Sequence, residues 1–579
     1  MFYTGAVIAW FDAPGRSAYY MSVTRTNLAP RRFATALLIL ILALSTIVPG
    51  TIAATETARS GGTFTLANRG DPPAGFDSMR TSSIAMHHVG GALFGPGNLV
   101  MRCRDNMYAV CPYLATRWEH SPDFRVWTFV IRNDAFWHDG TRFTAEDAKF
   151  YFDLVFFGAR SGTAVRAPAY FARELGDAES VEVLEGRRLR ITFRHRNAHF
   201  LEILANPRFK IAHPRHLMQP RIDAGEVGVT PLEVGLVGLG PFRLDRYRRG
   251  SLVRVEKFDR YFERDGRGVR LPYLDRIDYV ILGDPFAIDI AFRSGRLDGT
   301  ARGLSHNLTQ ERMDAYVRDL GDGVFFARSD GGNFRLAFNV LNEGPWQDPR
   351  VRRAIGLWID KPAAIPSALG GFGWTTPSIG PGDINVPTHF INWPRYDTQP
   401  LDVRRAEARR LMAEAGYADG FSMGHLTRGI MTETAEFLKA QLAGLKIDLQ
   451  LQIVDEGEWN RGRVSLDYDS QQGRLAPSPI PEGTESVYGR YEFNADAYAK
   501  HDDRRIDELY RRLRNATIME QRIEIWRQVS RYLFYEQTYI VPIAESIEVI
   551  AYRSYVRGLV VPPEDTHTHT DFATVWLDR

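Results

Sequence analysis

Residues 127–157 read WTFVIRNDAFWHDGTRFTAEDAKFYFDLVFF. The first five residues are aromatic and β-branched and predict a strand. Thr144, followed three residues later by Asp147 and then by an apolar run to Phe157, predicts a capped helix start. A general acid and base role for Glu146 and Asp147 is the alternative interpretation, but the spacing favours capping. A strand followed by a helix in this way indicates a mixed α/β protein.

The alternation of strand and helix patterns continues on both sides of this stretch. Further strands are predicted at 63–67, 189–193 and 447–453, and further helices at 348–361, 401–416, 432–445 and 504–535. Residues 473–489 are rich in Pro, Ser and Gly and predict a long surface loop, which is often functional at this length.

Composition excludes several classes of protein. The chain has 579 residues, of which 44% are hydrophobic and 25% charged, so we expect a globular protein with more than one core. A net charge of +2 gives no basic footprint for nucleic acid. The sequence contains no phosphate-binding P-loop, no G-x-S-x-G nucleophile motif and no H-E-x-x-H zinc motif. We therefore expect neither a nucleotide-driven motor nor a common type of hydrolase.

Residues 1–53 have the pattern of a signal peptide. Arg31 and Arg32 precede an apolar run from Ala34 to Val48, and small residues follow up to Ala54. The run is shorter than the roughly 20 residues of a membrane span, which disfavours a membrane anchor. We expect export to the periplasm by the Sec or the twin-arginine route, with Met21 as an alternative translation start.

Two cysteines, Cys103 and Cys111, are present in the whole chain. In an oxidising compartment such a pair predicts a disulfide that closes a short loop, and two free thiols are the alternative.

Two polar clusters invite a metal or acid–base interpretation. His138 and Asp139 are adjacent, but neighbours in an extended segment face opposite ways, so an Asp-Gly turn is favoured. His567, His569 and Asp571 alternate, yet three ligands on one terminal segment are more typical of a solvated loop. We expect no metal and no cofactor.

Candidate ligand-binding residues are aromatic or cationic side chains outside regular apolar runs. Trp374, Trp393 and Trp459 lie near Gly-rich, Pro-rich or polar stretches and are predicted to stack on a ligand, with core filling as the alternative. Arg428 follows a predicted strand and is a candidate clamp for a ligand carboxylate, with a surface salt bridge as the alternative.

A series of short sequence blocks follows in a fixed order along the chain. The blocks are PYLATRWE at 112–119, FWHDG at 136–140, TAED at 144–147, GLGPF at 238–242, LPYLD at 271–275, SGRLD at 294–298 and DPRVRRAI at 348–355. In this order they resemble family 5 extracellular solute-binding proteins, the peptide- and nickel-binding receptors of ABC importers, and the resemblance runs from about Gly61 to the end of the chain.

The resemblance implies an α/β, bilobal periplasmic-binding-protein fold with an extra domain inserted in the first lobe. It implies a non-enzymatic, monomeric receptor that closes over a small-molecule or peptide ligand and then engages the membrane permease. The expected boundaries are 1–53 for the signal peptide, 54–103, 237–335 and 541–579 for the first lobe, 104–236 for the inserted domain and 336–540 for the second lobe.

One segment departs from the family pattern. Peptide-binding members usually carry an acidic residue in an Asp-Pro-rich segment that pairs with the ligand's ammonium group. Residues 475–485 lack that pattern, although Glu482 is a candidate substitute. Asn68 and Arg69, just after the first strand, are further candidates at the lobe interface. Dipeptides, longer peptides, opines, oligosaccharides and metal chelates all remain open as ligands.

Two functions of other classes also remain open. A secreted hydrolase would share the leader and the mixed fold, and a chaperone-like protein would bind unfolded chains in an open cleft. Turnover of substrate would identify the first, and broad, weak binding without closure the second.

Overall fold

The computed structural model describes residues 57–68, 70–81, 83–106, 109–158, 174–300, 308–375, 399–475, 485–490, 497–560 and 571–579. The predicted signal peptide, Arg69, Trp393, Glu482, His567 and His569 lie outside these ranges. From Ala58 onward the chain forms one structural unit. No helix within the described ranges has the length and apolarity needed to cross a bilayer.

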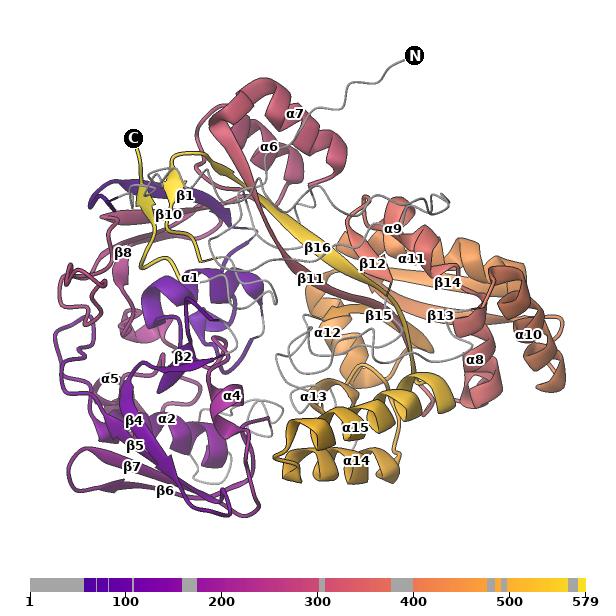
Figure 1. The fold of residues 1–579 in the computed structure, drawn as a ribbon, viewed down its shortest axis with the longest axis horizontal. Coiled ribbons are helices and arrows are strands. Elements are labelled where there is room, and N and C mark those ends of the chain that lie inside the picture. Colours follow the sequence, from indigo (N-terminus) through magenta and orange to yellow (C-terminus); the bar gives the residue numbers. More distant parts are fainter. Residues whose placement is uncertain are drawn as a thin grey trace, which may run out of the picture. The chain divides into compact units, whose positions relative to one another are not determined.

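A six-stranded sheet contains the two longest strands of the chain (Figure 1). Its order is β12 (Gly373–Thr375), β16 (Ile540–Arg553), β11 (Val324–Phe338), β15 (Ser470–Leu475), β13 (Phe421–Arg428) and β14 (Ile447–Val454). β11 and β16 run antiparallel along their length, with register shifts between Asp330 and Gly332 and between Phe334 and Arg335. β13 is parallel to both β14 and β15.

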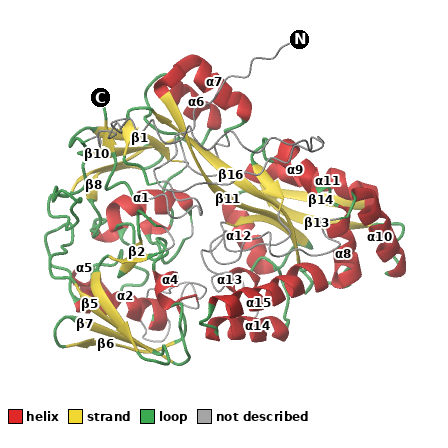
Figure 2. Ribbon diagram, in the orientation of Figure 1, coloured by secondary structure: helices red, strands yellow, loops and turns green. Residues whose placement is uncertain are grey.

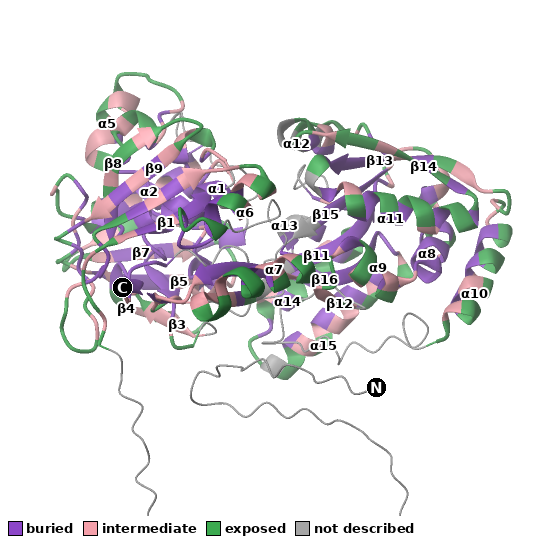
Figure 3. Ribbon diagram, turned by 90° about the horizontal axis from the view of Figure 1, so that it is seen from above, coloured by how far each residue is buried: buried purple, intermediate pink, exposed green. Residues whose placement is uncertain are grey.

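Helices cover both faces of this sheet (Figure 2). Phe334 and Leu336 of β11 pack in one core with residues of four helices, namely α8 (Pro349–Trp358), α9 (Lys361–Ala368), α10 (Leu401–Glu414) and α11 (Thr432–Leu442). Ala337, which points the other way, packs in a second core with α13 (Glu485–Tyr488), α14 (Arg504–Asn515) and α15 (Met519–Ser530). α10 turns a row of exposed residues outward, whereas the long strand β16 is largely buried (Figure 3).

A four-stranded sheet has the order β1 (Thr63–Asn68), β10 (Arg276–Ile281), β9 (Leu252–Lys257) and β8 (Phe242–Arg248), with α1 (Ile84–Phe94) in the same core. The far half of β16 reaches this core, where the rings of Phe64 and Tyr552 are stacked with centroids 6.4 Å apart. α6 (Pro285–Arg293) and α7 (Gln310–Leu320) pack with Val549 and Ala551 of the same strand. β11 and β16 therefore run from one core into another.

A second four-stranded sheet, which is fully antiparallel, lies between β1 and β8 in the sequence. Its order is β4 (Ala115–His120), β5 (Val126–Ile131), β7 (Arg188–Phe193) and β6 (Ala178–Leu184), and α2 (Ala145–Phe157) packs on it. Asp147 accepts the backbone N–H of Thr144 at 2.9 Å, so the predicted capping interaction is confirmed. The remaining elements are β2 (Val100–Arg102), β3 (Val110–Pro112), α4 (Phe200–Leu204), α5 (Arg215–Asp223), β17 (Val556–Arg557) and β18 (Trp576–Leu577).

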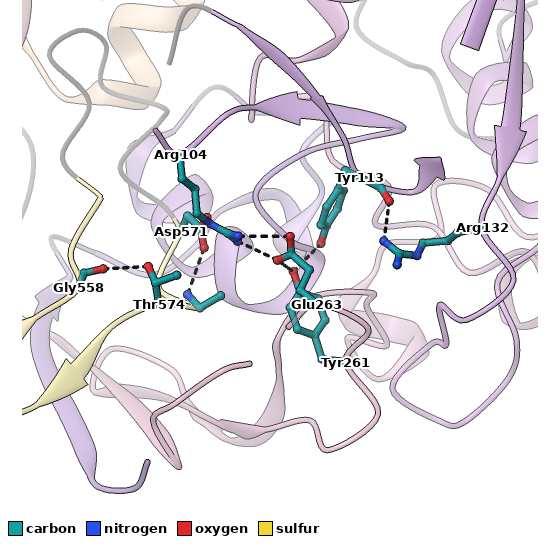
Figure 4. A network of polar contacts seen from close by, with 9 residues as sticks. Arg104, Tyr113, Arg132, Tyr261, Glu263, Gly558, Asp571 and Thr574 are labelled. Carbon is teal, nitrogen blue, oxygen red and sulfur yellow. Dashed lines mark hydrogen bonds and ion pairs between the residues drawn. The ribbon is translucent and has the colours of Figure 1, made fainter. Parts of the chain in front are cut away.

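A partly buried polar network joins three distant segments (Figure 4). Arg104 donates to Glu263 at 2.8 Å and to Asp571 at 2.5 Å, and Asp571 also accepts the backbone N–H of Ala573 at 3.1 Å. Tyr261 donates to the same Glu263 carboxylate, and burial, together with that negative charge, raises the pKa of Tyr261. Through Arg104, the network holds the segment between β2 and β3 against Glu263 and Asp571.

The structure places Cys103 and Cys111 at disulfide distance, with an S–S separation of 1.99 Å. The pair closes the loop that begins next to Arg104.

Two predicted elements need correction. The predicted helix 504–535 is divided, because α14 ends at Asn515 and α15 starts at Met519, with extended backbone at Ala516 and Ile518 between them. The predicted loop 473–489 includes the end of β15 and the short helix α13, because the strand pairs with β11 up to Leu475. The sequence pattern predicts a loop throughout this stretch because its centre is rich in proline and glycine, and these residues outweigh the strand and helix residues at its two ends.

The boundaries expected at 335 and 540 fall on these long strands. Arg335 lies inside β11, and Ile540 is the first residue of β16. Both expected boundaries of the second lobe, 336 and 540, therefore lie on β11 and β16, which pair with each other on both sides of residue 335 of β11.

Candidate functional site

Two arginines flank a glycine on one face of the six-stranded sheet. Arg335 of β11 is the register partner of Gly473 in β15, and Leu426 of β13 is the partner of Gln471. Continuing that parallel register by two residues brings Arg428 level with Gly473. Because side chains alternate across a strand, Arg335 faces away from the core that contains Phe334 and Leu336. Arg335 and Arg428 therefore share a face, on either side of a residue without a side chain.

Helix α12 (Glu456–Ser465) contributes the aromatic part of this face. Asp455 caps the helix by accepting the backbone N–H of Glu458 at 2.7 Å. Trp459 and Arg463 are four residues apart and thus neighbours on one side of the helix. Trp459 is only 2% exposed and packs against Leu426 and Tyr468.

Five side chains alternate between cation and aromatic ring. The Cζ atom of Arg428 lies 4.1 Å from the ring centroid of Trp459, and that of Arg463 lies 4.2 Å from the same ring. Arg463 is also 5.0 Å from the ring of Tyr498, and Arg335 is 4.1 Å from it. We call Arg335, Arg428, Trp459, Arg463 and Tyr498 the cation–aromatic stack.

The stack is removed from water. Arg335 is 0% exposed, and Arg428 and Arg463 are also buried. Each cation over an aromatic face is worth roughly 0.5–2 kcal/mol, but a charge taken out of water costs several kcal/mol unless an anion compensates it. Arg335, whose Nε and Nη2 atoms have no hydrogen-bond partner among the described residues, is therefore suited to an anionic ligand.

Neutral polar groups fix the strands beneath the stack. His425 of β13 lies 2.9 Å from the hydroxyl of Ser470, and burial lowers the pKa of His425 to about 3, so the imidazole is uncharged. Gln472 donates to Thr427 at 2.5 Å and to the carbonyl of Met431 at 2.7 Å. These contacts hold β13 and β15 in the register that aligns the two arginines.

Tyr488 of α13 joins the site from the other side of Arg335. The Nη1 atom of Arg335 donates to the Tyr488 hydroxyl at 3.4 Å. Burial raises the pKa of Tyr488, so this hydroxyl stays protonated and is a neutral neighbour.

The structure brings two of the predicted ligand-binding residues together, Arg428 and Trp459. Trp374 lies on the edge strand β12, is 38% exposed and is paired in register with Glu545, outside the stack. Asn68 is buried, and its amide donates to the carbonyls of Gly70 and Ala85 at 2.9 and 3.2 Å, which holds the start of α1. The positions of Trp393, Glu482 and Arg69 are not among those described.

Sequence patterns did not single out Arg335, Arg463 or Tyr498. A signal for Arg335 existed, because the alternation from Asn333 to Phe338 places apolar residues on one face and Arg335 on the opposite face. A signal for Arg463 was its four-residue spacing from Trp459. Nothing local marks Tyr498, which reaches the stack from a segment just before Lys500.

The adjacent His138 and Asp139 do not share a site, and of the second polar cluster only Asp571 is among the described residues. His138 accepts from the backbone N–H of Gly238 at 3.1 Å, whereas Asp139 lies 2.6 Å from His216. Asp571 is paired with Arg104. Among the described residues no group of three or more His, Cys, Asp and Glu side chains could hold a metal ion.

Comparison with known proteins gives consistent matches. Residues 109–492 match the model of bacterial extracellular solute-binding proteins, family 5 Middle. The di/tripeptide-binding protein 2 of Pseudomonas aeruginosa (strain UCBPP-PA14) is 25% identical over 539 residues, which cover 88% of this chain and 93% of that protein.

Solved structures extend the fold match to most of the chain. AgaA from A.tumefacien R10 in complex with agropinic acid has a TM-score of 0.74 at 22% identity, over 90% of this chain and 99% of that chain. DppA from Helicobacter pylori in complex with peptide STSA has a TM-score of 0.75 at 18% identity, over 90% of this chain and 99% of that chain. The predicted α/β periplasmic-binding-protein fold is confirmed by these matches.

Proposed function

Because this chain belongs to family 5 of the bacterial extracellular solute-binding proteins, a family of non-catalytic ABC-transporter binding proteins, we propose that it captures a peptide or an opine-like solute and delivers it to a membrane permease. The observation that supports this proposal is the buried pair of Arg428 and Trp459 at the end of β13. A guanidinium group can hold a ligand carboxylate through two hydrogen bonds, while the indole ring supplies an apolar surface beside it.

Relatives support both ligand classes. The Pseudomonas protein is named for di- and tripeptides, and the A.tumefacien protein was solved with agropinic acid. A peptide and an opine-like acid share a carboxylate, which is the group that Arg428 is positioned to bind. The absence of an Asp-Pro-rich pattern at 475–485 favours the acid end of the ligand over its ammonium end as the anchor.

The long strands β11 and β16 suit a receptor that closes over its ligand. Each strand runs from the core of the four-stranded sheet into the six-stranded sheet. A closed, ligand-bound state is a shape that a permease can distinguish from the open one, so capture and delivery follow from one population shift. We propose that the protein acts as a monomer in the periplasm, exported through the signal peptide of residues 1–53.

A ligand panel with thermal unfolding and titration calorimetry tests this function. A solute that binds only the folded protein adds about 2.7 kcal/mol of stability at 100 times its Kd. Di-, tri- and longer peptides, opines, oligosaccharides and nickel chelates form the panel. A shift with a peptide or an opine supports the proposal, and a panel in which only a sugar or a chelate binds contradicts it.

The variant Arg428→Met identifies the anchor. Losing a charge-assisted hydrogen bond costs about 1.5–3 kcal/mol, so the affinity should fall by about 10- to 100-fold. The matched control is Arg405→Met, because Arg405 also lies over a tryptophan, with Cζ 4.9 Å from the ring of Trp358. Equal losses in both variants would show that Arg428 acts on the fold and not on the ligand.

A further inference from the structure

Arg335 carries donors that the chain leaves unused. Its Nε and Nη2 atoms are buried and have no hydrogen-bond partner in the structure, and no ion pair joins Arg335 to another described residue. These two atoms form one edge of the guanidinium group, the edge that a carboxylate binds with two parallel hydrogen bonds. Its third nitrogen, Nη1, already donates to Tyr488.

A buried arginine without an anion is costly, and this chain offers a direct comparison. Arg352 is also buried, but it donates to the carbonyls of Trp346, Gln347 and Gln537, at 2.7 Å, 2.8 Å and 2.8 Å. Arg352 is thus a satisfied structural arginine. Arg335 is equally enclosed, yet one complete donor edge lacks an acceptor.

Arg335 lies close to other cations. The stack holds three guanidinium groups, and Glu545, an acidic side chain on the same sheet face, accepts from Asn333 at 2.9 Å. The indole Nε1 of Trp459 is a further buried donor without a hydrogen-bond partner in the structure. Arg335 and Trp459 therefore supply buried donors that a single carboxylate bound by Arg428 would leave unused.

Gly473 sets the spacing between the two arginines. Arg335 and Arg428 lie on the strands to either side of β15, and neighbouring strands are about 4.8 Å apart, so their backbones are about 10 Å apart. A Cβ atom on Gly473 would lie 3.2 Å from Nη2 of Arg335 and 2.2 Å from the ring of Tyr498. The glycine therefore leaves room for the ring of Tyr498 to lie over β15, next to the Nη2 atom of Arg335.

We propose that the solute carries two acidic groups, one bound by Arg428 and the second by the Nε and Nη2 edge of Arg335, with its middle part against Trp459 and Tyr498. This inference rests on the proposed function and names its ligand class, a small diacid such as an acidic dipeptide or a dicarboxylic opine. A peptide or an opine with one carboxylate would leave Arg335 without an anion.

Matched ligand pairs test the proposal by calorimetry on the mature protein. Each pair consists of a diacid and its mono-amide, for example Ala-Glu with Ala-Gln, and an opine diacid with its mono-amide. In the wild-type protein the tightest-binding diacid should bind at least tenfold more tightly than its amide. A tighter-binding amide, or a neutral or singly acidic solute that binds more tightly than every diacid, overturns the inference.

The variant Arg335→Met separates ligand recognition from folding. It should reduce the preference for the diacid over its amide to less than threefold, while the ligand-free protein unfolds at the same or a higher temperature. The control Arg352→Met should lower the unfolding temperature and leave the preference unchanged. A variant Arg335→Met that keeps the preference, or that loses stability as Arg352→Met does, overturns the inference.

The two proposals fail in different ways. If a peptide or an opine binds but diacids have no advantage, the diacid inference fails and the receptor function stands. If no peptide or opine binds, the proposed function fails and takes the inference with it.

Discussion

Replacing Gly473 with alanine should disturb the cation–aromatic stack without changing any charge. The new Cβ would lie 2.2 Å from Cε1 and 2.6 Å from Cδ1 of Tyr498, whereas ordinary contacts are 3.4–4 Å, so the ring has to move by more than 1 Å. The backbone of β15 cannot yield easily, because Gly473 is paired with Arg335 in β11.

The magnitude follows from what the tyrosine ring touches. Overpacking costs about 1–3 kcal/mol, and a weakened contact with Arg335 adds up to about 1 kcal/mol, so the free energy of unfolding should fall by about 1–4 kcal/mol. Because the ring also contacts Arg463, the geometry of the stack changes, and we expect the affinity for the solute to fall by about 10- to 100-fold.

Urea unfolding and titration calorimetry measure both effects. Gly429→Ala is the matched control, because a Cβ at Gly429 has nothing within 4 Å and the residue follows Arg428 directly. Adding Tyr498→Leu should relieve the clash, so that the double variant is about as stable as Tyr498→Leu alone. Wild-type stability and affinity in Gly473→Ala would refute the packing argument.

Three further predictions concern other parts of the molecule. Burial lowers the pKa of Lys210 from 10.5 to about 7, so the unfolded state binds the proton more strongly and the wild-type protein loses stability as the pH drops from 10.5 toward 7. Lys210→Met should therefore be about 2–4 kcal/mol more stable than wild type at pH 6, and this gain should shrink when urea unfolding is repeated at pH values up to 9.5. A pH-independent gain would contradict the prediction. Asp571→Asn should cost about 1–3 kcal/mol in the same assay, because Arg104 loses one of its two carboxylate partners, the one at 2.5 Å, and an unchanged midpoint would show that this contact is dispensable. Cys103 and Cys111 should resist alkylation until a reductant is added, which mass spectrometry can measure. Reduction should lower the free energy of unfolding by about 2 kcal/mol for a loop of this length. Immediate alkylation would indicate free thiols.

Local signals predicted local structure well. The cap formed by Thr144 and Asp147 depends on two residues three positions apart, so the sequence contains all of the information for it. The division between α14 and α15 was missed because apolar spacing continues across Ala516 to Ile518, and only the backbone there leaves the helix.

The site was predictable only in part. Arg428 and Trp459 were recognisable because each is a chemically distinctive residue in an irregular or polar setting. Arg335 was not, because what distinguishes it is an unused donor edge and a glycine on the neighbouring strand, both of which arise when β11 and β15 pair. Such properties belong to contacts between residues more than 100 positions apart, and no periodicity within one segment reports them.

The core of the four-stranded sheet has a consequence for biosynthesis. Phe64 and Leu66 share that core with Phe572, Val575 and Leu577, and Arg579 donates to the carbonyl of Thr63 across 516 positions. This core cannot be completed until both segments have been made, since contacts so distant in sequence form only when both partners are available. The nascent chain should consequently remain incompletely packed during translation, a condition that suits the Sec route, which is one of the two export routes that the leader leaves open.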